Sequence, residues 1–363
     1  MLGTQSKELD THKNNFIVME RKLATVRKIS ELRSIEGADK IELAIVDGWQ
    51  VVVAKDVEHK VGNKVVYCEI DSFLPIRDEF EFLRKSSYKK MGDQEGFRLK
   101  TIKLRGQVSQ GLILPIHVLP ITQFATAHDL PEGMDVTEML GIVKYEPPIP
   151  AELAGKVKGL FPSFIHKTDE ERIQNLVKEY DEWKYTSKHK FYVTEKLDGS
   201  SATYYIKDGE FGVCSRNLEL LETEGNTFWK VARELNLEEH MKATEKNISL
   251  QGELIGEGIQ GNPYKIKGHT VRFFTGFDID KGQRIPFPEL VVMLSDMGLQ
   301  YVPVLNKEHG FMLPETVEDM LKYAEGKSML NPNVEREGVV VGSMDGTISF
   351  KAISNKFLLE ENN

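Results

Sequence analysis

Three closely spaced prolines near the middle of the chain constrain its organisation most. Pro147, Pro148 and Pro150 each remove a backbone hydrogen-bond donor and disfavour regular structure around them. We therefore expect a break between two domains, which a length of 363 residues allows. The expected division is a flexible tail over residues 1–15, a first domain over 16–141, a linker over 142–165 and a second domain over 166–363.

Short strand-like runs separated by turns fill the first domain. Residues 43–53 are rich in β-branched side chains around an Asp-Gly turn, and residues 64–70 follow another glycine. Residues 98–104 and 111–116 continue this pattern. Because no long helical stretch interrupts these runs, we expect a small β-barrel of the OB type.

The second domain opens with a helical pattern. Thr168 and Glu171 form a capping-box pair, and apolar residues then recur at helical spacing from Ile173 to Trp183. We expect one helix here, with Arg172 in its first turn and away from the apolar face.

The rest of the second domain mixes helices with strands. Strands are expected over 191–196 and 202–206, and helices over 288–297 and 315–325, each helix followed by a glycine. The strands and helices do not alternate regularly, so the pattern predicts an α+β domain. The sequence contains neither a Rossmann glycine fingerprint nor a Walker lysine loop.

Four short segments place charged side chains beside glycines or apolar residues. In chain order they are Lys196-Leu197-Asp198-Gly199, Gly252-Glu253-Leu254-Ile255-Gly256, Glu337-Gly338-Val339-Val340 and Phe350-Lys351. An amine, two carboxylates and a second cation are the groups needed to attack a nucleotide α-phosphate with the help of a metal ion. The first segment alone is a weak signal, but the ordered set predicts covalent nucleotidyl transfer.

This ordered set resembles the covalent nucleotidyltransferase superfamily of ATP-dependent polynucleotide ligases and GTP-dependent mRNA capping enzymes. The chain looks most like the RNA ligases that carry an OB-like domain ahead of the catalytic domain, with a likeness from about Phe16 to the C-terminus. In capping enzymes and most DNA ligases an OB domain follows the catalytic domain, whereas only a short segment follows Lys351 here. The resemblance implies an N-terminal OB-like barrel and then a ligase-type α+β nucleotidyltransferase domain.

The resemblance also implies the catalytic residues. Lys196 is the expected nucleophile, which would form a lysyl-AMP intermediate. A free lysine has a pKa near 10.4, so attack requires burial or nearby cations to lower it. Lys351 and a bound Mg²⁺ could supply that field. Asp198 is expected to support the lysine and the nucleotide, and Gly199 to allow a tight turn.

The nucleotide-binding residues follow from the same resemblance. They are Glu195, Lys196, Leu197, Gly199, Arg172, Arg216, Phe277, Lys351 and Lys356. Among them, Phe277 resembles the aromatic that stacks on adenine, and Arg172 resembles an arginine that contacts phosphate. Many relatives end in Lys-x-Lys, but Ile353 occupies the second lysine position here, so Lys356 is a candidate substitute.

Glu253 and Glu337 are the expected ligands of Mg²⁺ or Mn²⁺, because such hard cations take one or two carboxylates plus water and phosphate oxygens. A three-residue turn with Gly346 in the left-handed position would place Glu337 and Lys351 on one face of a hairpin. A two-residue turn would place them on opposite faces. We predict the three-residue turn, with Ile353 opposite Glu337.

The overall charge of the chain is negative, but one segment of the first domain is strongly basic. The net charge is −9, so any contact with nucleic acid depends on a basic patch. A basic run in the first domain has Tyr88 and Phe97 among its cations. Inside an OB-like domain we expect this run to contact RNA phosphates; its members are Arg84, Lys85, Lys89, Lys90, Arg98, Lys100, Lys103 and Arg105.

Several features favour an intracellular protein. No apolar run approaches the length of a membrane span, and no signal-peptide core is present. The two cysteines, Cys68 and Cys214, are far apart and indicate buried thiols, not a zinc site or a disulfide framework.

We therefore expect an ATP-dependent RNA ligase that joins 3′-OH and 5′-phosphate ends in RNA repair, acting as a monomer and with a nicked duplex as one possible substrate. Two alternatives remain. A capping-type enzyme would attach GMP instead of AMP, and a non-catalytic RNA-binding OB protein would attach neither nucleotide.

Overall fold

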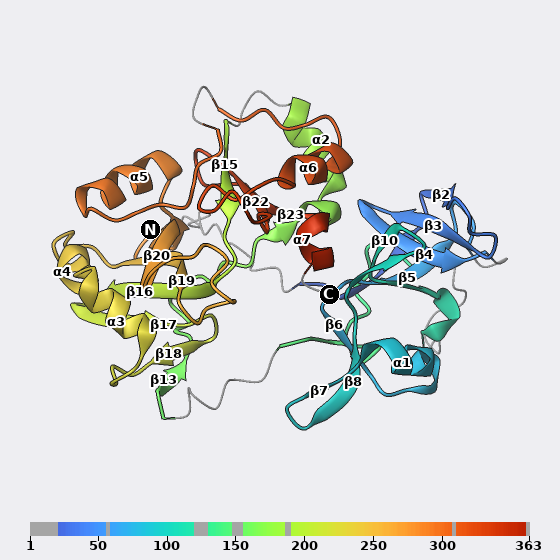
Figure 1. Ribbon diagram of the computed structural model, residues 1–363, viewed down its shortest axis with the longest axis horizontal. Helices are drawn as coiled ribbons and strands as arrows, with labels where there is room; N and C mark the ends of the chain where they lie inside the picture. Colours follow the sequence, from blue (N-terminus) through green and yellow to red (C-terminus); the bar gives the residue numbers. More distant parts are fainter. Residues whose placement is uncertain are drawn as a thin grey trace, which may run out of the picture.

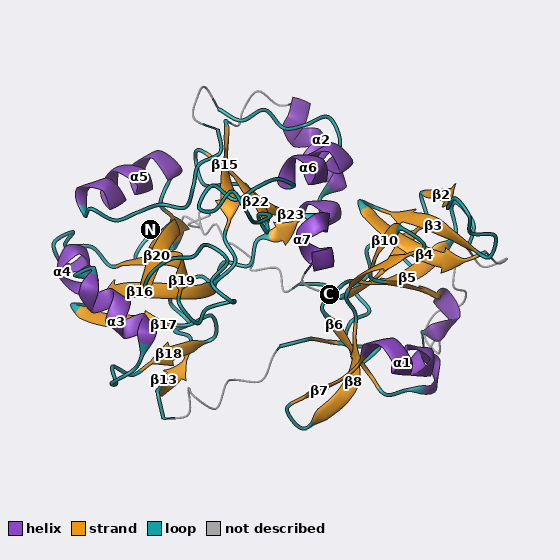
Figure 2. Ribbon diagram, viewed as in Figure 1, coloured by secondary structure: helices purple, strands orange, loops and turns teal. Residues whose placement is uncertain are grey.

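A computed structural model describes residues 21–55, 59–119, 130–146, 155–185, 190–306 and 310–360 (Figure 1). The tail predicted over residues 1–15 lies outside this range. The described chain forms two parts, with a strand-rich N-terminal domain beside a second domain of mixed helices and strands (Figure 2). Within the described residues, no helix is long and apolar enough to cross a membrane.

The N-terminal domain is built from short antiparallel sheets. One sheet contains β1 (Ala24–Lys28), β5 (Lys64–Cys68) and β11 (Leu112–Pro115). A second contains β2 (Glu31–Ser34), β3 (Ile41–Val46) and β4 (Trp49–Ala54). A pair is formed by β9 (Thr101–Leu104) and β10 (Gln107–Gln110). The last sheet contains β12 (Val143–Lys144), β6 (Ser72–Pro75), β8 (Gln94–Arg98) and β7 (Tyr88–Met91).

Alternation of side chains explains how these strands make a core. Along β4, Trp49, Val51 and Val53 are buried while the residues between them are half-buried. A short helical stretch, η1 (Asp78–Leu83) and α1 (Arg84–Ser87), contributes Phe80 to the core. The ladders between the described strands of this domain do not close into a barrel.

The second domain contains two sheets. The larger is seven-stranded, in the order β13 (Val157–Leu160), β18 (Leu218–Leu220), β17 (Glu210–Cys214), β16 (Ser200–Lys207), β19 (Ile248–Gly256), β20 (His269–Asp278) and β21 (Gln283–Arg284). The smaller has four strands, in the order β14 (Glu171–Arg172), β23 (Ser349–Ile353), β22 (Gly338–Ser343) and β15 (Phe191–Lys196).

Helices cover one face of each sheet, which leaves the other faces free to build a cleft. The larger sheet packs against α3 (Thr227–Glu234), α4 (Leu237–Lys242) and α5 (Phe287–Asp296). The smaller packs against α2 (Val177–Tyr185) and α6 (Val317–Ala324). The last helix, α7 (Asn355–Glu360), packs Leu358 against the core of the N-terminal domain.

Most elements of the second domain agree with the sequence, including β15, β16, α5 and α6. The first helix does not. It begins at Val177, because Glu171 and Arg172 form strand β14 and residues 173–175 form a single 3-10 turn. Glu171 does not close a capping box; its carboxylate accepts hydrogen bonds from the Arg172 backbone and the Asn175 amide. Arg172 is therefore a strand residue, not part of a first helical turn.

Two sequence boundaries also differ from the structure. The run over residues 98–104 divides between β8 and β9, which belong to different sheets. The segment expected to be a linker, 142–165, contains β12, which pairs with β6, and β13, which pairs with β18. Both ends of that segment are thus paired into the domains that they join.

The hairpin of β22 and β23 has the register of a two-residue turn, so the predicted three-residue register is wrong. Gly338 pairs with Ile353 and Val340 with Lys351. The side chain of Ser343 stabilises this turn by accepting the backbone N–H of Ile348 at 2.9 Å and donating to Asp345 at 2.5 Å. Gly346 has a positive φ of 78°, as expected.

Candidate active site

Strand alternation places the key cations on one face of the smaller sheet. Lys196 pairs with Gly338, Thr194 with Val340, and Val340 with Lys351. Because paired residues point to the same face, Lys196 and Lys351 both face the cleft between the sheets. The cleft has a volume of about 1300 Å³ and is lined by both lysines, Glu253 and Glu337.

Lys196 ends β15 at the edge of this cleft. Its Nζ donates to Glu337 Oε1 at 2.6 Å. Burial alone would lower the pKa of Lys196, but the carboxylates of Glu337, Glu253 and Asp198 outweigh burial and raise it. In the free protein the amine is therefore protonated and paired, and lowering its pKa requires a ligand that competes for these carboxylates.

Glu337 reaches Lys196 in spite of the unexpected hairpin register. It precedes the first residue of β22, so the strand alternation does not fix its side chain. Glu253 comes from β19 on the facing sheet. Burial, together with the charges of Glu337 and Asp198, raises the pKa of Glu253 to about 8. Two sheets thus contribute one carboxylate each beside the same amine.

The turn after Lys196 is tightly packed. A Cβ at Gly199 would lie 2.5 Å from Leu254 O and 2.9 Å from Glu253 Cγ, so glycine allows this approach. Leu197 is buried, and the backbone N–H of Asp198 donates to the Tyr264 hydroxyl at 2.6 Å. The turn therefore fixes the position of Lys196 relative to Glu253.

Lys351 and Arg172 lie side by side on neighbouring parallel strands. Lys351 Nζ donates to Asp169 Oδ1 at 3.0 Å. Burial, helped by the charges of Arg172 and Lys196, lowers the pKa of Lys351 to about 8. Arg172 is 7% exposed, and its Nε and Nη1 atoms are buried with no hydrogen-bond partner among the described residues. This pair offers donors to an anionic ligand.

Asp169 is a site residue that the sequence did not indicate. It holds Lys351, Lys144 at 2.8 Å and Arg216 at 3.5 Å. Burial opposes ionisation of Asp169, but the neighbouring lysines hold its pKa far below the usual range. Asp169 occurs in no recognisable local pattern, because its partners come from three distant segments. Arg21 also lines the cleft unexpectedly.

Three predicted nucleotide-binding residues differ from the expected arrangement: Glu195 lines the cleft but directs its carboxylate away from Lys196, and Phe277 and Lys356 do not line it. Glu195 points to the opposite face from Lys196, and its Oε2 accepts the backbone N–H of Met329 at 2.7 Å. The ring of Phe277 lies 5.4 Å from the His166 ring and is not among the residues lining the cleft, whereas Phe274 is. Lys356, on α7, pairs with Glu325 at 3.0 Å and does not replace the second lysine in the cleft.

The predicted basic run is divided between α1, which carries Arg84 and Lys85, and two hairpins of the N-terminal domain. Lys89 lies on β7 and Lys103 on β9, and both are exposed. Arg98 instead lies over the Tyr145 ring, 4.4 Å from its centroid, and pairs with Asp71 at 3.1 Å. The run therefore supplies exposed lysines on two separate hairpins, whereas Arg98 is half-buried and already paired with Asp71.

The carboxylates of the cleft fit a hard divalent cation. No group of three or more metal-type side chains gathers anywhere in the part of the chain that is described. Glu253 and Glu337 nevertheless both act on Lys196, and two carboxylates are what Mg²⁺ or Mn²⁺ needs when phosphate and water oxygens complete its shell.

Comparison with known proteins defines the class. One family model, an OB-fold domain, matches residues 23–116, and another, RNA ligase, matches residues 189–356. None of the curated proteins matches the chain.

Solved structures of an RNA ligase from Naegleria gruberi extend this likeness to nearly the whole chain. A variant without ligand is 44% identical, with a TM-score of 0.85, covering 93% of this chain and 97% of that one. A variant with AMP and manganese is 45% identical, with a TM-score of 0.86 and coverages of 94% and 99%. Another, with ATP and manganese, is 44% identical, with a TM-score of 0.85 and coverages of 94% and 99%.

Fold and site thus define a nucleotidyltransferase with an N-terminal OB-fold domain. The chain belongs to the RNA ligase family. The sequence-based prediction of this family and of its domain order is confirmed.

Proposed function

We propose that this protein is an ATP-dependent RNA ligase that forms a lysyl-AMP on Lys196 and joins RNA 3′-OH and 5′-phosphate ends. The observation that carries the proposal is the position of the Lys196 amine, 2.6 Å from Glu337 and on the same sheet face as Lys351. Structures of the Naegleria ligase with ATP, AMP, pyrophosphate and manganese support ATP as the substrate and a divalent metal as the cofactor.

In the first step, the Lys196 ammonium releases a proton to solvent, and the lone pair of Nζ that this frees forms a bond to the α-phosphorus of ATP, with loss of a second proton as the phosphoramidate forms. The bond from that phosphorus to the β-phosphate oxygen breaks, and pyrophosphate leaves with the electron pair. Glu337 orients the amine, and the Lys351 cation faces the charge that develops on the phosphates. A divalent metal held by Glu253 and Glu337 would lower the pKa of the amine and neutralise charge on the α-phosphate.

The next two steps pass the AMP group on. An oxygen of the RNA 5′-phosphate attacks the AMP phosphorus, the bond to Nζ breaks, and the lysine takes up a proton. The 3′-OH then loses its proton as it attacks the activated 5′-phosphate, and AMP departs. Arg172 has two buried guanidinium nitrogens without a hydrogen-bond partner in the described part of the chain, so it is suited to hold phosphate oxygens during transfer.

RNA contact is proposed for the two exposed basic hairpins, β7–β8 and β9–β10. Lys89 and Lys103 represent these surfaces, which would follow the backbone of a nicked duplex without reading its sequence. We infer a monomer acting in RNA repair, because the described chain by itself supplies the nucleophile, both carboxylates and the cationic side chains used in the three steps.

Strand joining tests this proposal. With Mg²⁺ and ATP, the wild type should seal a nicked RNA duplex with a 3′-OH and a 5′-phosphate, and GTP should not support sealing. Lys196→Ala should fail with ATP but should seal RNA that already carries a 5′-adenylate. Sealing by Lys196→Ala with ATP and an ordinary 5′-phosphate would refute the assignment of the nucleophile.

A further inference from the structure

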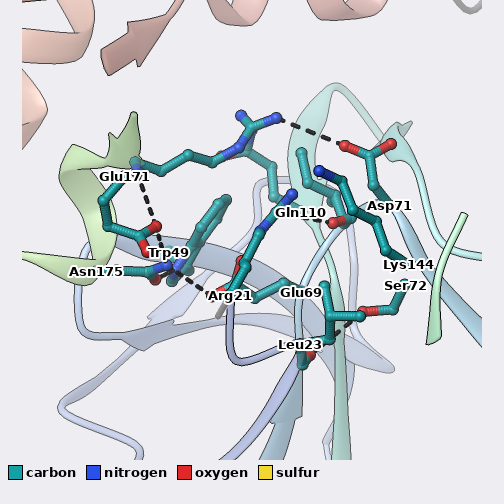
Figure 3. A network of polar contacts seen from close by, with 12 residues as sticks. Arg21, Leu23, Trp49, Glu69, Asp71, Ser72, Gln110, Lys144, Glu171 and Asn175 are labelled. Carbon is teal, nitrogen blue, oxygen red and sulfur yellow. Dashed lines mark hydrogen bonds and ion pairs between the residues drawn. The ribbon is translucent and has the colours of Figure 1, made fainter. Parts of the chain in front are cut away.

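The segment that carries Arg172 is held by the N-terminal domain (Figure 3). Trp49 Nε1, from β4, donates to Asn175 Oδ1 at 2.6 Å. Asn175 Nδ2 donates in turn to Glu69 Oε1 at 2.6 Å and to Glu171 Oε1 at 2.9 Å. Trp49 and Glu69 are buried, so this network is shielded from water and specifies one geometry.

Backbone contact reinforces this network. The N–H of Gly48 donates to the carbonyl of Gln174 at 3.1 Å. A Cβ at Gly48 would lie 2.8 Å from Gln174 Cα, so the two backbones touch with no room for a side chain. The turn before Trp49 and the segment before Asn175 therefore form a single packed unit across the domain boundary.

Strand β14 depends on such support because it is very short. It contains only Glu171 and Arg172, and among the described strands it pairs with β23 alone, where Arg172 lies opposite Lys351. Among the described residues, the Arg172 guanidinium has its contacts with the N-terminal domain: Cζ is 5.9 Å from the Trp49 ring centroid, and Nη2 is 3.7 Å from Asp71 Oδ2. The catalytic domain supplies the backbone of this arginine, and the N-terminal domain supplies the contacts of its side chain.

We propose that the N-terminal domain has a positioning function in nucleotidyl transfer: through Trp49 and Asn175 it fixes strand β14 and holds Arg172 beside Lys351 for contact with the nucleotide phosphates. This inference rests on the phosphate-binding role proposed for Arg172. Trp49 and Asn175 touch no reacting atom, so they are positioning residues. Their indole and amide groups couple the placement of one domain to the chemistry of the other.

A double-mutant cycle on the full chain tests the proposal. Trp49→Phe keeps a ring but removes the indole donor, and it should slow adenylylation of Lys196 by about tenfold or more, because small displacements at a reacting site are costly. In an Arg172→Ala background the same change should add no more than about twofold, because the residue through which Trp49 acts is gone.

A matched control separates positioning from stability. Trp229 is also buried, and its Nε1 donates to the Leu220 carbonyl at 2.9 Å within the catalytic domain, away from the interface. Trp229→Phe should lower the melting temperature as Trp49→Phe does, but leave adenylylation within about twofold of wild type. Asn175→Ala provides a second route to the same cycle if Trp49→Phe does not fold.

The outcomes distinguish this inference from the function that it builds on. Wild-type adenylylation by Arg172→Ala would overturn the role proposed for Arg172. A strong loss in Arg172→Ala with a normal rate in Trp49→Phe and Asn175→Ala would leave that role standing and overturn the positioning function. Independent, multiplying losses in the double variants would also overturn it, since the two residues would then act separately.

Discussion

Gly199→Ala should separate the geometry of the nucleophile turn from the stability of the domain. The added Cβ would lie 2.5 Å from Leu254 O, 2.8 Å from Ile255 Cγ2 and 2.9 Å from Glu253 Cγ. Such overpacking costs about 1–3 kcal/mol. For a domain of this size that corresponds to a fall of roughly 2–12 °C in melting temperature.

The catalytic loss should be larger than this stability loss suggests. Relief of the clash moves either the turn that carries Lys196 or the carboxylate of Glu253, and a displacement near 1 Å costs about a hundredfold in rate. The assay is single-turnover transfer of AMP from ATP to the protein, followed well below the melting temperature. Gly159→Ala is the control, because a Cβ there meets nothing within 4 Å. A rate in Gly199→Ala equal to that of Gly159→Ala would refute the reasoning.

Three further predictions follow from the same geometry. The pKa of Glu253 is raised to about 8, so the folded state keeps a proton that the unfolded state loses, and the stability of the wild type should fall as pH rises from about 4.5 to 8. Glu253→Gln should remove this pH-dependent part of the stability, so melting curves in which both proteins lose stability equally over this range would contradict the prediction. Lys351→Ala should reduce adenylylation of Lys196 by about a hundredfold, whereas Lys356→Ala, which breaks a surface ion pair with Glu325, should stay within about twofold of the wild-type rate. Equal losses in the two variants would contradict the placement of Lys351 in the cleft and of Lys356 outside it. Lys89→Ala and Lys103→Ala should each weaken RNA binding and lower the salt dependence of binding by the equivalent of about one phosphate contact, while adenylylation of Lys196 stays unchanged. An unchanged salt dependence in both variants would exclude these two lysines from the RNA-binding surface.

The sequence predicted which side chains line this site better than it predicted how they are arranged. Lys196, Glu253, Glu337 and Lys351 occur beside glycines or on apolar strands, so local pattern was enough to find them, and the cleft brings them together. Arg172 was correctly expected to line the site, but the sequence placed it in the first turn of a helix. The strand that it occupies is formed by pairing with β23, which lies far away in the sequence, so no local pattern contains it.

The remaining differences have similar causes. The register of the hairpin is stabilised by Ser343, whose hydroxyl bonds across the turn, and counting turn residues could not show this. Lys356 looked like a second lysine for the cleft, but helix α7 begins at Asn355 and directs it toward Glu325. Asp169 gathers cations from three separate segments, so only the folded structure reveals it.

The central claim is that Lys196 becomes covalently bonded to AMP. The most direct measurement is the intact mass of the protein, first freed of bound nucleotide and then incubated with Mg²⁺ and ATP or GTP, with Lys196→Ala alongside. The wild type should gain the mass of one AMP from ATP and nothing from GTP, and the variant should gain nothing. An adduct on Lys196→Ala, a GMP adduct on the wild type, or no adduct in folded wild type with either Mg²⁺ or Mn²⁺ would contradict the account.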